Sequence, residues 1–328
     1  MNILIVAQGK IPVCKYGGTE RVLSSLCSAL NDQKHNVSLL APEGSSLPFS
    51  NGRVYNFDPN APLAPQIPSS IDCVHLNCNH IGDISIPYIV TIHGNPEFGE
   101  KLDLNSVFVS QNHAFRHNST SWIHNGLDWR EYGDVDLTLK RRYFHFLAKA
   151  AWRVKNLQGA IDITNKNSHK LEVLGGSRLN IKMGFRLTLS QHVHFNGMVD
   201  EKKKSIILPR SKGLIFPVRW HEPFGLALIE SLYFGCPVFG TPYGSLPEIV
   251  GEQYGFLSSS KRKLAQYIND HRYNPNECHE YALNNFDSKT MASRYTTLYE
   301  RVISGEHLNQ TIPTLKDVPS DKFLPWLE

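Results

Sequence analysis

The chain has few cysteines, and none of them forms a short motif. The six cysteines are scattered without a Cys-x-x-Cys pair, which argues for reduced thiols in a cytosol and against disulfides. Long apolar runs are missing too, since no segment approaches the ~18 uncharged apolar residues of a membrane span. The apolar start at residues 2–7 has no basic lead-in, so it predicts a buried strand rather than a secretory signal.

A strong excess of charge is also absent. The 34 basic and 30 acidic residues give a net charge of +4, which is too small to indicate nucleic acid as the main partner. Short basic clusters at 202–204 and 261–263 have two interpretations. They are solvated loop or helix ends, or they assist weak docking on anionic lipid. We therefore expect a cytoplasmic protein, with a peripheral contact to the inner face of the membrane left open.

Length and hydrophobic pattern predict two α/β domains. A chain of 328 residues with 41% apolar content suits two domains of roughly 150 residues. Short apolar runs alternate with helical patterns, which is typical of doubly wound parallel sheets. The strands are expected at 2–7, 36–41, 73–76, 88–92, 106–109, 142–148, 170–174, 192–195, 213–216, 237–240 and 256–257, and the helices at 19–31, 156–165, 261–269 and 287–304. Residues 42–70 are expected to be irregular, and the tail from 305 allows no prediction.

The most informative pattern places two glutamates around the start of a helix. Glu222 precedes Pro-Phe-Gly, and Glu230 lies eight positions on, inside the helical pattern. Free N–H groups of the first turn, about Gly225 to Leu228, form an anion site suited to a diphosphate. Glu222 and Glu230 would then meet hydroxyl groups on either side of it. The alternative is a loop glutamate and a surface glutamate that only complements the helix dipole.

Two lysines and a glycine pair add to this pattern. Lys149 and Lys155 lie on either side of a strand-to-helix turn, where both could reach a diphosphate, or could be solvated loop residues. Gly17 and Gly18 allow backbone N–H groups to approach a ligand at the start of a helix. A lone Gly-Gly is weak evidence, because it is more often a turn.

Together these motifs resemble the retaining nucleotide-sugar glycosyltransferases of family four. The resemblance runs to about residue 304 and is most specific at 222–230, with 245–248 following it. Supporting pieces occur in the expected order at 17–22, 91–94, 123–128, 146–149 with Lys155, and 193–197. It implies the GT-B fold, in which two Rossmann-like domains face each other across a cleft. The expected division is an acceptor-side domain at 1–135, a donor domain at 136–290, and a C-terminal helix and tail at 291–328. Whether this helix returns to the first domain is left open.

The resemblance also implies a reaction and residue roles. A sugar would pass from a nucleotide-diphosphate donor to a hydroxyl of a glycan or glycolipid, in bacterial-type surface polysaccharide synthesis, with no cofactor. Lys149 and Lys155 would neutralise the diphosphate; the family usually has arginine where Lys149 stands. Glu222 with the Phe224, Gly225 and Leu226 backbone would hold the donor sugar and phosphate, and Glu230 the ribose. His93 would contact the donor sugar and, with Gly18, face the reaction centre. The loop of Gly17 and Gly18 would sit over the donor phosphates and near the acceptor.

Two motifs offer a metal instead, and we favour neither. Asp134 and Asp136 form the Asp-x-Asp of another glycosyltransferase architecture, but here they lie in a polar connector rather than after a buried strand. His113 and His117 have helical i, i+4 spacing without the glutamate of a His-Glu-x-x-His motif. We therefore expect no metal.

Two other functions stay open at this point. A nucleotide-sugar epimerase on the same architecture would turn over without an acceptor. A non-catalytic subunit that binds the sugar nucleotide would support a partner transferase. The presence of His93, both lysines and both glutamates argues against a degenerate copy.

Overall fold

The structure, a computed structural model, describes residues 1–13, 17–78, 84–181, 183–270, 273–317 and 321–328. The chain divides into two compact units, each built on a parallel six-stranded sheet. Unit 1 comprises residues 1–129 and 286–318, and unit 2 comprises residues 130–285 and 319–328. Within the described residues, no helix has both the length and the apolar composition needed to cross a membrane.

The sheet of unit 1 contains the strands that the apolar runs predict. In spatial order they are β3 (Val54–Asn56), β2 (Asn36–Ala41), β1 (Asn2–Val6), β4 (Cys73–Leu76), β5 (Tyr88–Ile92) and β6 (Ser106–Phe108). Strand β3 and the 3-10 turn η1 (Ala64–Gln66) lie in the stretch expected to be irregular. That expectation was wrong because β3 is a short edge strand with little burial, so it carries no apolar run.

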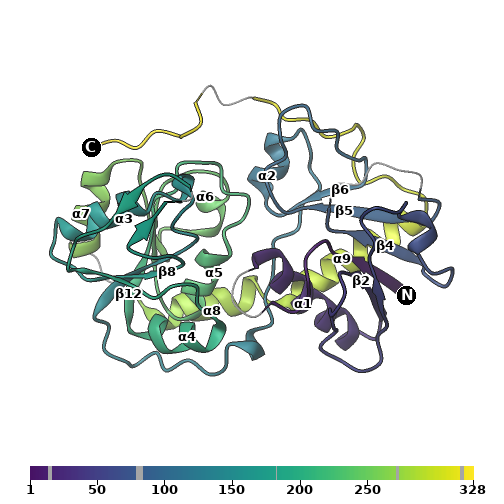
Figure 1. Cartoon of the computed structure of the whole chain (residues 1–328), viewed down its shortest axis with the longest axis horizontal. Coiled ribbons are helices and arrows are strands. Elements are labelled where there is room, and N and C mark those ends of the chain that lie inside the picture. The colour runs from purple at the N-terminus through teal and green to yellow at the C-terminus, as the bar shows by residue number, and fades with distance from the viewer. Residues whose placement is uncertain (14–16, 79–83, 182, 271–272, 318–320) are drawn as a thin grey trace. The chain divides into compact units, whose positions relative to one another are not determined.

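Two helices from opposite ends of the chain cover one face of this sheet. Figure 1 shows the purple α1 (Gly18–Asp32) beside the yellow α9 (Ser288–Ile303), and α9 also packs on β4 and β5. Beneath α9 the buried His75 ring bridges two hydroxyls. Its Nδ1 lies 2.7 Å from the Tyr299 hydroxyl, and its Nε2 lies 2.7 Å from Thr91 Oγ1. The other face packs on an apolar cluster. This cluster includes Leu63 and also Ala114, which belongs to α2 (Gln111–Arg116).

The sheet of unit 2 repeats the same connection order. Its strands, in spatial order, are β11 (Val193–Phe195), β8 (Leu171–Leu174), β7 (Tyr143–Leu147), β12 (Ser211–Phe216), β13 (Val238–Gly240) and β14 (Gly255–Leu257). If the six strands of each main sheet are numbered in chain order, their spatial order in both sheets is 3-2-1-4-5-6. This is the Rossmann order. The order therefore reverses between β7 and β12. A separate antiparallel pair, β9 (Leu179–Asn180) and β10 (Arg186–Leu187), is inserted between β8 and β11.

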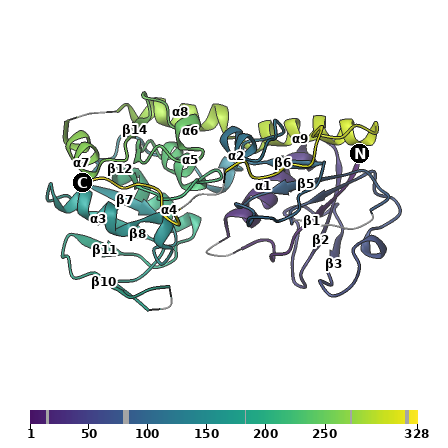
Figure 2. The ribbon, with the colours of Figure 1, turned by 90° about the horizontal axis from the view of Figure 1, so that it is seen from above.

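Helices lie on both faces of this second sheet. Helices α3 (Leu157–Asn165) and α7 (Lys261–Asp270) pack together on one face, and α5 (Leu226–Tyr233) and α8 (Pro275–Asn285) pack together on the other (Figure 2). The sequence did not predict α8 because it buries only the small Cys278 and Ala282, which leave no apolar stripe. It also missed α4 (Glu201–Ile207) and the short α6 (Leu246–Ile249). The described cysteines are free thiols, and Cys14 lies outside the described residues.

Each sheet buries one neutral histidine, which predicts a loss of stability in acid. Burial lowers the pKa of both His75 and His145 to about 3; the His145 ring bridges the hydroxyls of Ser211 and Ser231. The unfolded chain gains these protons near pH 6.5 and the native state does not. Stability is therefore complete above that pH and falls as the pH drops toward 3, by up to ~1.4 kcal/mol per pH unit for each ring.

Urea unfolding between pH 7.5 and 5 measures this effect. Wild type is compared with His145→Gln, which keeps a neutral hydrogen-bonding side chain but cannot titrate. The variant is less stable at neutral pH, and its free energy of unfolding changes less with pH. A variant with the same pH dependence as wild type would show that His145 does not contribute.

Candidate functional site

The donor residues expected in unit 2 gather where its strand order reverses. Lys149 follows the carboxyl end of β7, and Lys155 ends the 3-10 turn η3 (Arg153–Lys155) in the same connection. Glu222 follows β12, the neighbour of β7. In open α/β sheets, ligands bind at the carboxyl ends of the strands beside this reversal. We call this part of unit 2 the donor edge.

Lys155 and Glu222 form a buried ion pair. Lys155 Nζ lies 2.5 Å from Glu222 Oε2, and the Trp220 indole N–H donates to the same oxygen over 2.7 Å. The ammonium also lies 4.8 Å from the centre of the Trp220 ring and 5.3 Å from that of Phe216. Both charges are therefore held in place by specific partners.

The loop around Glu222 is fixed by the Gly-Ser-Leu-Pro-Glu motif that follows it. Gly244 has φ +66°, and a Cβ there would come within 2.2 Å of the Glu222 nitrogen, so only glycine fits. The Ser245 hydroxyl donates to the Phe224 carbonyl, and its backbone N–H donates to the Glu222 carbonyl. Phe224 is buried, and Gly225 adopts φ +81° as the N-cap, so that α5 begins at Leu226. The motif thus positions the loop and the helix start together.

Glu230 lies on the buried side of α5 and has a cation of its own. Its Oε1 accepts from the Tyr132 hydroxyl and from Lys204 Nζ, each over 2.7 Å. Lys204 belongs to the 202–204 cluster, whose solvated interpretation is therefore wrong at this position. Asp200 caps α4 by accepting from the Lys203 N–H, and the helix turns Lys204 into the unit.

Three partners in unit 2 were not identified from sequence: Lys204, Tyr132 and Trp220. Lys204 and Tyr132 stand 26 and 98 positions from Glu230, so no short motif links them. Trp220 lies two residues before Glu222, and its polar N–H was the one available signal.

Lys149 is the other cation of the donor edge. It is half-buried, and its ammonium lies 5.4 Å from the centre of the Trp152 ring. Within the described part of the chain, no carboxylate forms a salt bridge with it. Its charge is therefore less compensated than that of Lys155 and is suited to an anion.

His93, the candidate of unit 1, follows β5 and contacts the residue that follows β4. Its Nε2 lies 2.9 Å from Asn77 Oδ1. The Asn77 amide N–H groups donate to the carbonyls of Val6 and His75, which directs the amide oxygen at the ring. His93 Nε2 therefore carries the proton. Burial lowers the pKa of His93 to about 4, so the ring is neutral at pH 7.

The Gly17 and Gly18 pair stands at the start of α1, directly after residues 14–16, which lie outside the described residues. A Cβ on Gly17 would lie 2.6 Å from an oxygen of Glu20, in the first turn of the same helix. A carboxylate therefore already complements this helix end. The proposed approach of donor phosphates to this loop stays a prediction.

The two metal motifs lie in different surroundings, one in the core and one at the surface. His113 and His117 are buried and pack on the Phe108 ring, with 4.9 Å between centroids in each case. Asp134 and Asp136 are exposed, and Asp136 accepts from both the N–H and the hydroxyl of Thr138. Among the described residues, no three His, Cys, Asp or Glu side chains group as metal ligands would.

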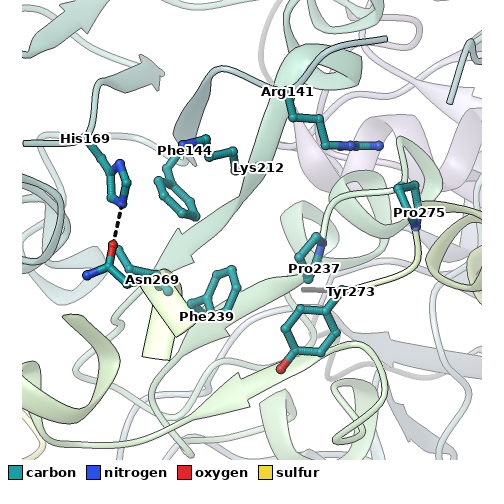
Figure 3. A pocket seen from close by; sticks show the side chains of 11 residues that line it. Arg141, Phe144, His169, Lys212, Pro237, Phe239, Asn269, Tyr273 and Pro275 are labelled. Atoms are coloured by element: carbon teal, nitrogen blue, oxygen red, sulfur yellow. Dashed lines mark hydrogen bonds between the residues drawn. The ribbon is translucent and has the colours of Figure 1, made fainter. Parts of the chain in front are cut away.

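One cavity of unit 2 lies at the opposite end of the strands from the donor edge. Its volume is about 380 Å³, and the residues around it include Arg141 and Phe144 at the start of β7 and Lys212 at the start of β12 (Figure 3). Arg141 donates to the carbonyls of Ser211 and Phe234, so it ties backbone segments together. None of the residues predicted for the site lines this cavity.

Comparisons with known proteins find similarity to glycosyltransferases. Residues 139–286 match the family described as glycosyl transferases group 1. The O-antigen chain mannosyltransferase C of Escherichia coli is 21% identical over 261 residues. That alignment covers 75% of this chain and 65% of the length of the relative, so the chain spans less than two thirds of it. Over the matched residues the chain is therefore similar to glycosyltransferases of the group 1 type.

Solved structures show the fold. AviGT4, a glycosyltransferase involved in avilamycin A biosynthesis, superposes with a TM-score of 0.73 at 17% identity, covering 93% of this chain and 98% of that one. The sucrose-phosphate synthase of Thermosynechococcus elongatus gives 0.70 at 16% identity, with coverages of 93% and 100%. HepE of Anabaena, in complex with UDP and glucose, gives 0.64 at 15%, with coverages of 92% and 99%. The expected α/β class with two Rossmann-like domains of the GT-B type is confirmed.

The buried pair predicts a coupling between Lys155 and Glu222. Removing either charge alone leaves the other buried and unpaired, which costs about 3–5 kcal/mol of stability. In Lys155→Met with Glu222→Gln neither charge remains, so the double variant should lose less than the sum of the single losses. Urea unfolding of the four proteins measures the coupling. Losses that add to within about 0.5 kcal/mol would contradict it.

Proposed function

We propose that this chain is a retaining, metal-independent glycosyltransferase with a nucleotide-diphosphate sugar as donor. The acceptor is a hydroxyl of a glycan or glycolipid, and the setting is the synthesis of a surface polysaccharide. The role of the curated relative in O-antigen chains and the UDP and glucose bound by HepE support this setting and this class of donor. The protein needs no resident cofactor in this scheme.

One observation carries the proposal: Lys149 and Lys155 lie in the connection after β7, and Lys155 pairs with Glu222 in the loop that leads from β12 into α5. Departure of a diphosphate develops negative charge, which cations and aligned N–H groups stabilise without a metal. Lys149 supplies a charge that no described carboxylate neutralises. Helix α5 begins at Leu226, so the backbone N–H groups of its first turn lie directly after Gly225. The left-handed conformation of Gly225 turns the chain into the helix.

The Lys155–Glu222 pair gives the donor sugar a defined acceptor atom. Among the described residues, both hydrogen bonds to Glu222 use Oε2, which leaves Oε1 for a sugar hydroxyl. The Lys155 ammonium orients the Glu222 carboxylate through its hydrogen bond to Oε2. Its role is therefore divided between orienting Glu222 and neutralising the diphosphate.

Glu230 would accept from the ribose, and His93 would contact the donor sugar. Lys204 and Tyr132 fix the rotamer of Glu230 before any nucleotide arrives. The neutral ring of His93 donates from Nε2 to Asn77, so its Nδ1 is the acceptor toward a sugar hydroxyl. Retention would then follow from attack on the same face that the diphosphate leaves, with the diphosphate assisting removal of the proton.

Separate substitutions at the two glutamates test this division. Glu230→Gln should weaken binding of free nucleotide by about 1.5–3 kcal/mol, because a charged acceptor for ribose hydroxyls is lost. Glu222→Gln should leave free nucleotide binding nearly unchanged and lower turnover, because free nucleotide lacks the sugar. Calorimetry with UDP, GDP and ADP, paired with steady-state rates, distinguishes them. Equal losses of nucleotide affinity would show that the roles are not divided this way.

A chelator tests whether the reaction needs a metal. Turnover should persist in EDTA, and Asp134→Asn with Asp136→Asn should retain activity, because both aspartates are exposed and Thr138 already engages Asp136. Rates with and without acceptor are measured in the same series. Activity abolished by EDTA and restored by magnesium or manganese would overturn the metal-free reaction, and turnover without acceptor would identify an epimerase.

A further inference from the structure

The hairpin formed by β9 and β10 exposes an unusual amount of apolar surface. Along residues 179–189 every second side chain is apolar and at least partly exposed. In this alternation the apolar residues are Leu179, Ile181, Met183, Phe185, Leu187 and Leu189, which we call the hairpin face. Leu179 lies directly opposite Leu187 in the antiparallel pair, so these two side chains share one side of the hairpin. Contiguous apolar surface of this kind marks an interaction site.

The other side of the hairpin fastens it to unit 2. Arg178 donates to the carbonyls of Thr188, Ser190 and Val193, and Arg186 donates to the carbonyl of Ser177. Both guanidinium groups lie over the Phe195 ring of β11, at 5.8 and 5.3 Å from its centre. Since the hairpin is tied down by these contacts, its exposed apolar side chains are held at the surface of unit 2.

The charged residues of the hairpin segment itself are all basic. Residues 173–199 contain Arg178, Lys182 and Arg186 and no aspartate or glutamate. The turn at Gly184 also approaches a further cation, since a Cβ there would lie 3.6 Å from Arg153 Cδ. Exposed apolar side chains on a segment of net positive charge match a bilayer that carries anionic headgroups, because the bilayer attracts the segment while the apolar groups insert.

The size of the patch also favours a bilayer over a second copy of the chain. Six side chains of this size and exposure offer roughly 600 Å², below the roughly 800 Å² per partner that a stable protein interface buries. Insertion into a bilayer needs no such minimum, because each buried apolar group adds to the binding.

We infer that the hairpin face is a membrane-docking surface for anionic bilayers. Its base lies beside the donor edge: the Gly175 carbonyl accepts from the Ala150 N–H, one residue beyond Lys149. Docking therefore brings the donor edge close to a lipid surface. The value of this closeness rests on the proposed function, because a transferase with a glycolipid acceptor meets that acceptor at a lipid surface. Docking itself does not depend on catalysis.

Vesicle sedimentation without any nucleotide sugar tests the docking. The protein should bind vesicles that contain phosphatidylglycerol, bind those of phosphatidylcholine alone more weakly, and lose affinity as salt is added. Ile181→Ser with Phe185→Ser should lower the affinity about tenfold or more. The control is Phe98→Ser with Ile206→Ser, because these side chains are 74% and 64% exposed, against 77% for Phe185 and 70% for Ile181. The control should bind as wild type does.

Other results would overturn the inference. Absence of wild-type binding, or equal losses in the hairpin and control variants, would remove the hairpin from any lipid contact. A dimer in light scattering that only the hairpin variant abolishes would assign the face to a second copy of the chain. If the double variant melts early, Leu189→Ser alone should still weaken binding severalfold, and unchanged binding would count against docking. None of these outcomes depends on transferase activity, so docking and the proposed function can fail separately.

Discussion

The donor edge of unit 2 depends on charges that are buried only in pairs. A buried carboxylate or ammonium without a partner costs several kcal/mol, so Glu222 requires Lys155 and Glu230 requires Lys204. The first pair joins the loop after β7 to the loop after β12, and the second joins α4 to α5. The two pairs thus fix the surroundings of the α5 N-terminus from both sides. The apolar sheet provides the platform, and the ion pairs determine where its functional groups stand.

The sequence predicted most strands of the two main sheets because these strands are buried between helices and loops and are continuous apolar runs, but it missed the edge strand β3 and the pair β9 and β10. It predicted helices that carry an apolar stripe and missed α2, α4, α6 and α8. These are short or bury small residues, so their helicity comes from packing in the finished unit. Domain boundaries were expected at 135 and 290, whereas contacts divide the chain after 129 and 285. Such boundaries depend on which residues touch, and a one-dimensional pattern does not contain that information.

The candidate site was accessible from sequence only where its residues are close along the chain. Glu222, Gly225 and Glu230 stand in one short motif, and Gly244 and Ser245 follow soon after it. Sequence reasoning gave Lys155 to the diphosphate and Glu222 to the sugar as separate tasks. The structure joins the two in one ion pair, so a change at either residue also changes the other. Lys204 could not be recognised from the sequence. The direction of its side chain depends on how α4 packs in unit 2, and the sequence pattern did not predict α4.

The tyrosines that cover His75 belong to α9, which is encoded after the whole main segment of unit 2. During synthesis from the N-terminus, strands β1, β4 and β5 therefore emerge long before the helix that buries one of their faces. Until α9 leaves the ribosome, His75 and Thr91 have no tyrosine hydroxyls to meet. Each unit is completed only by a segment from the C-terminal part of the chain, so neither sheet has all of its native contacts until synthesis is nearly finished.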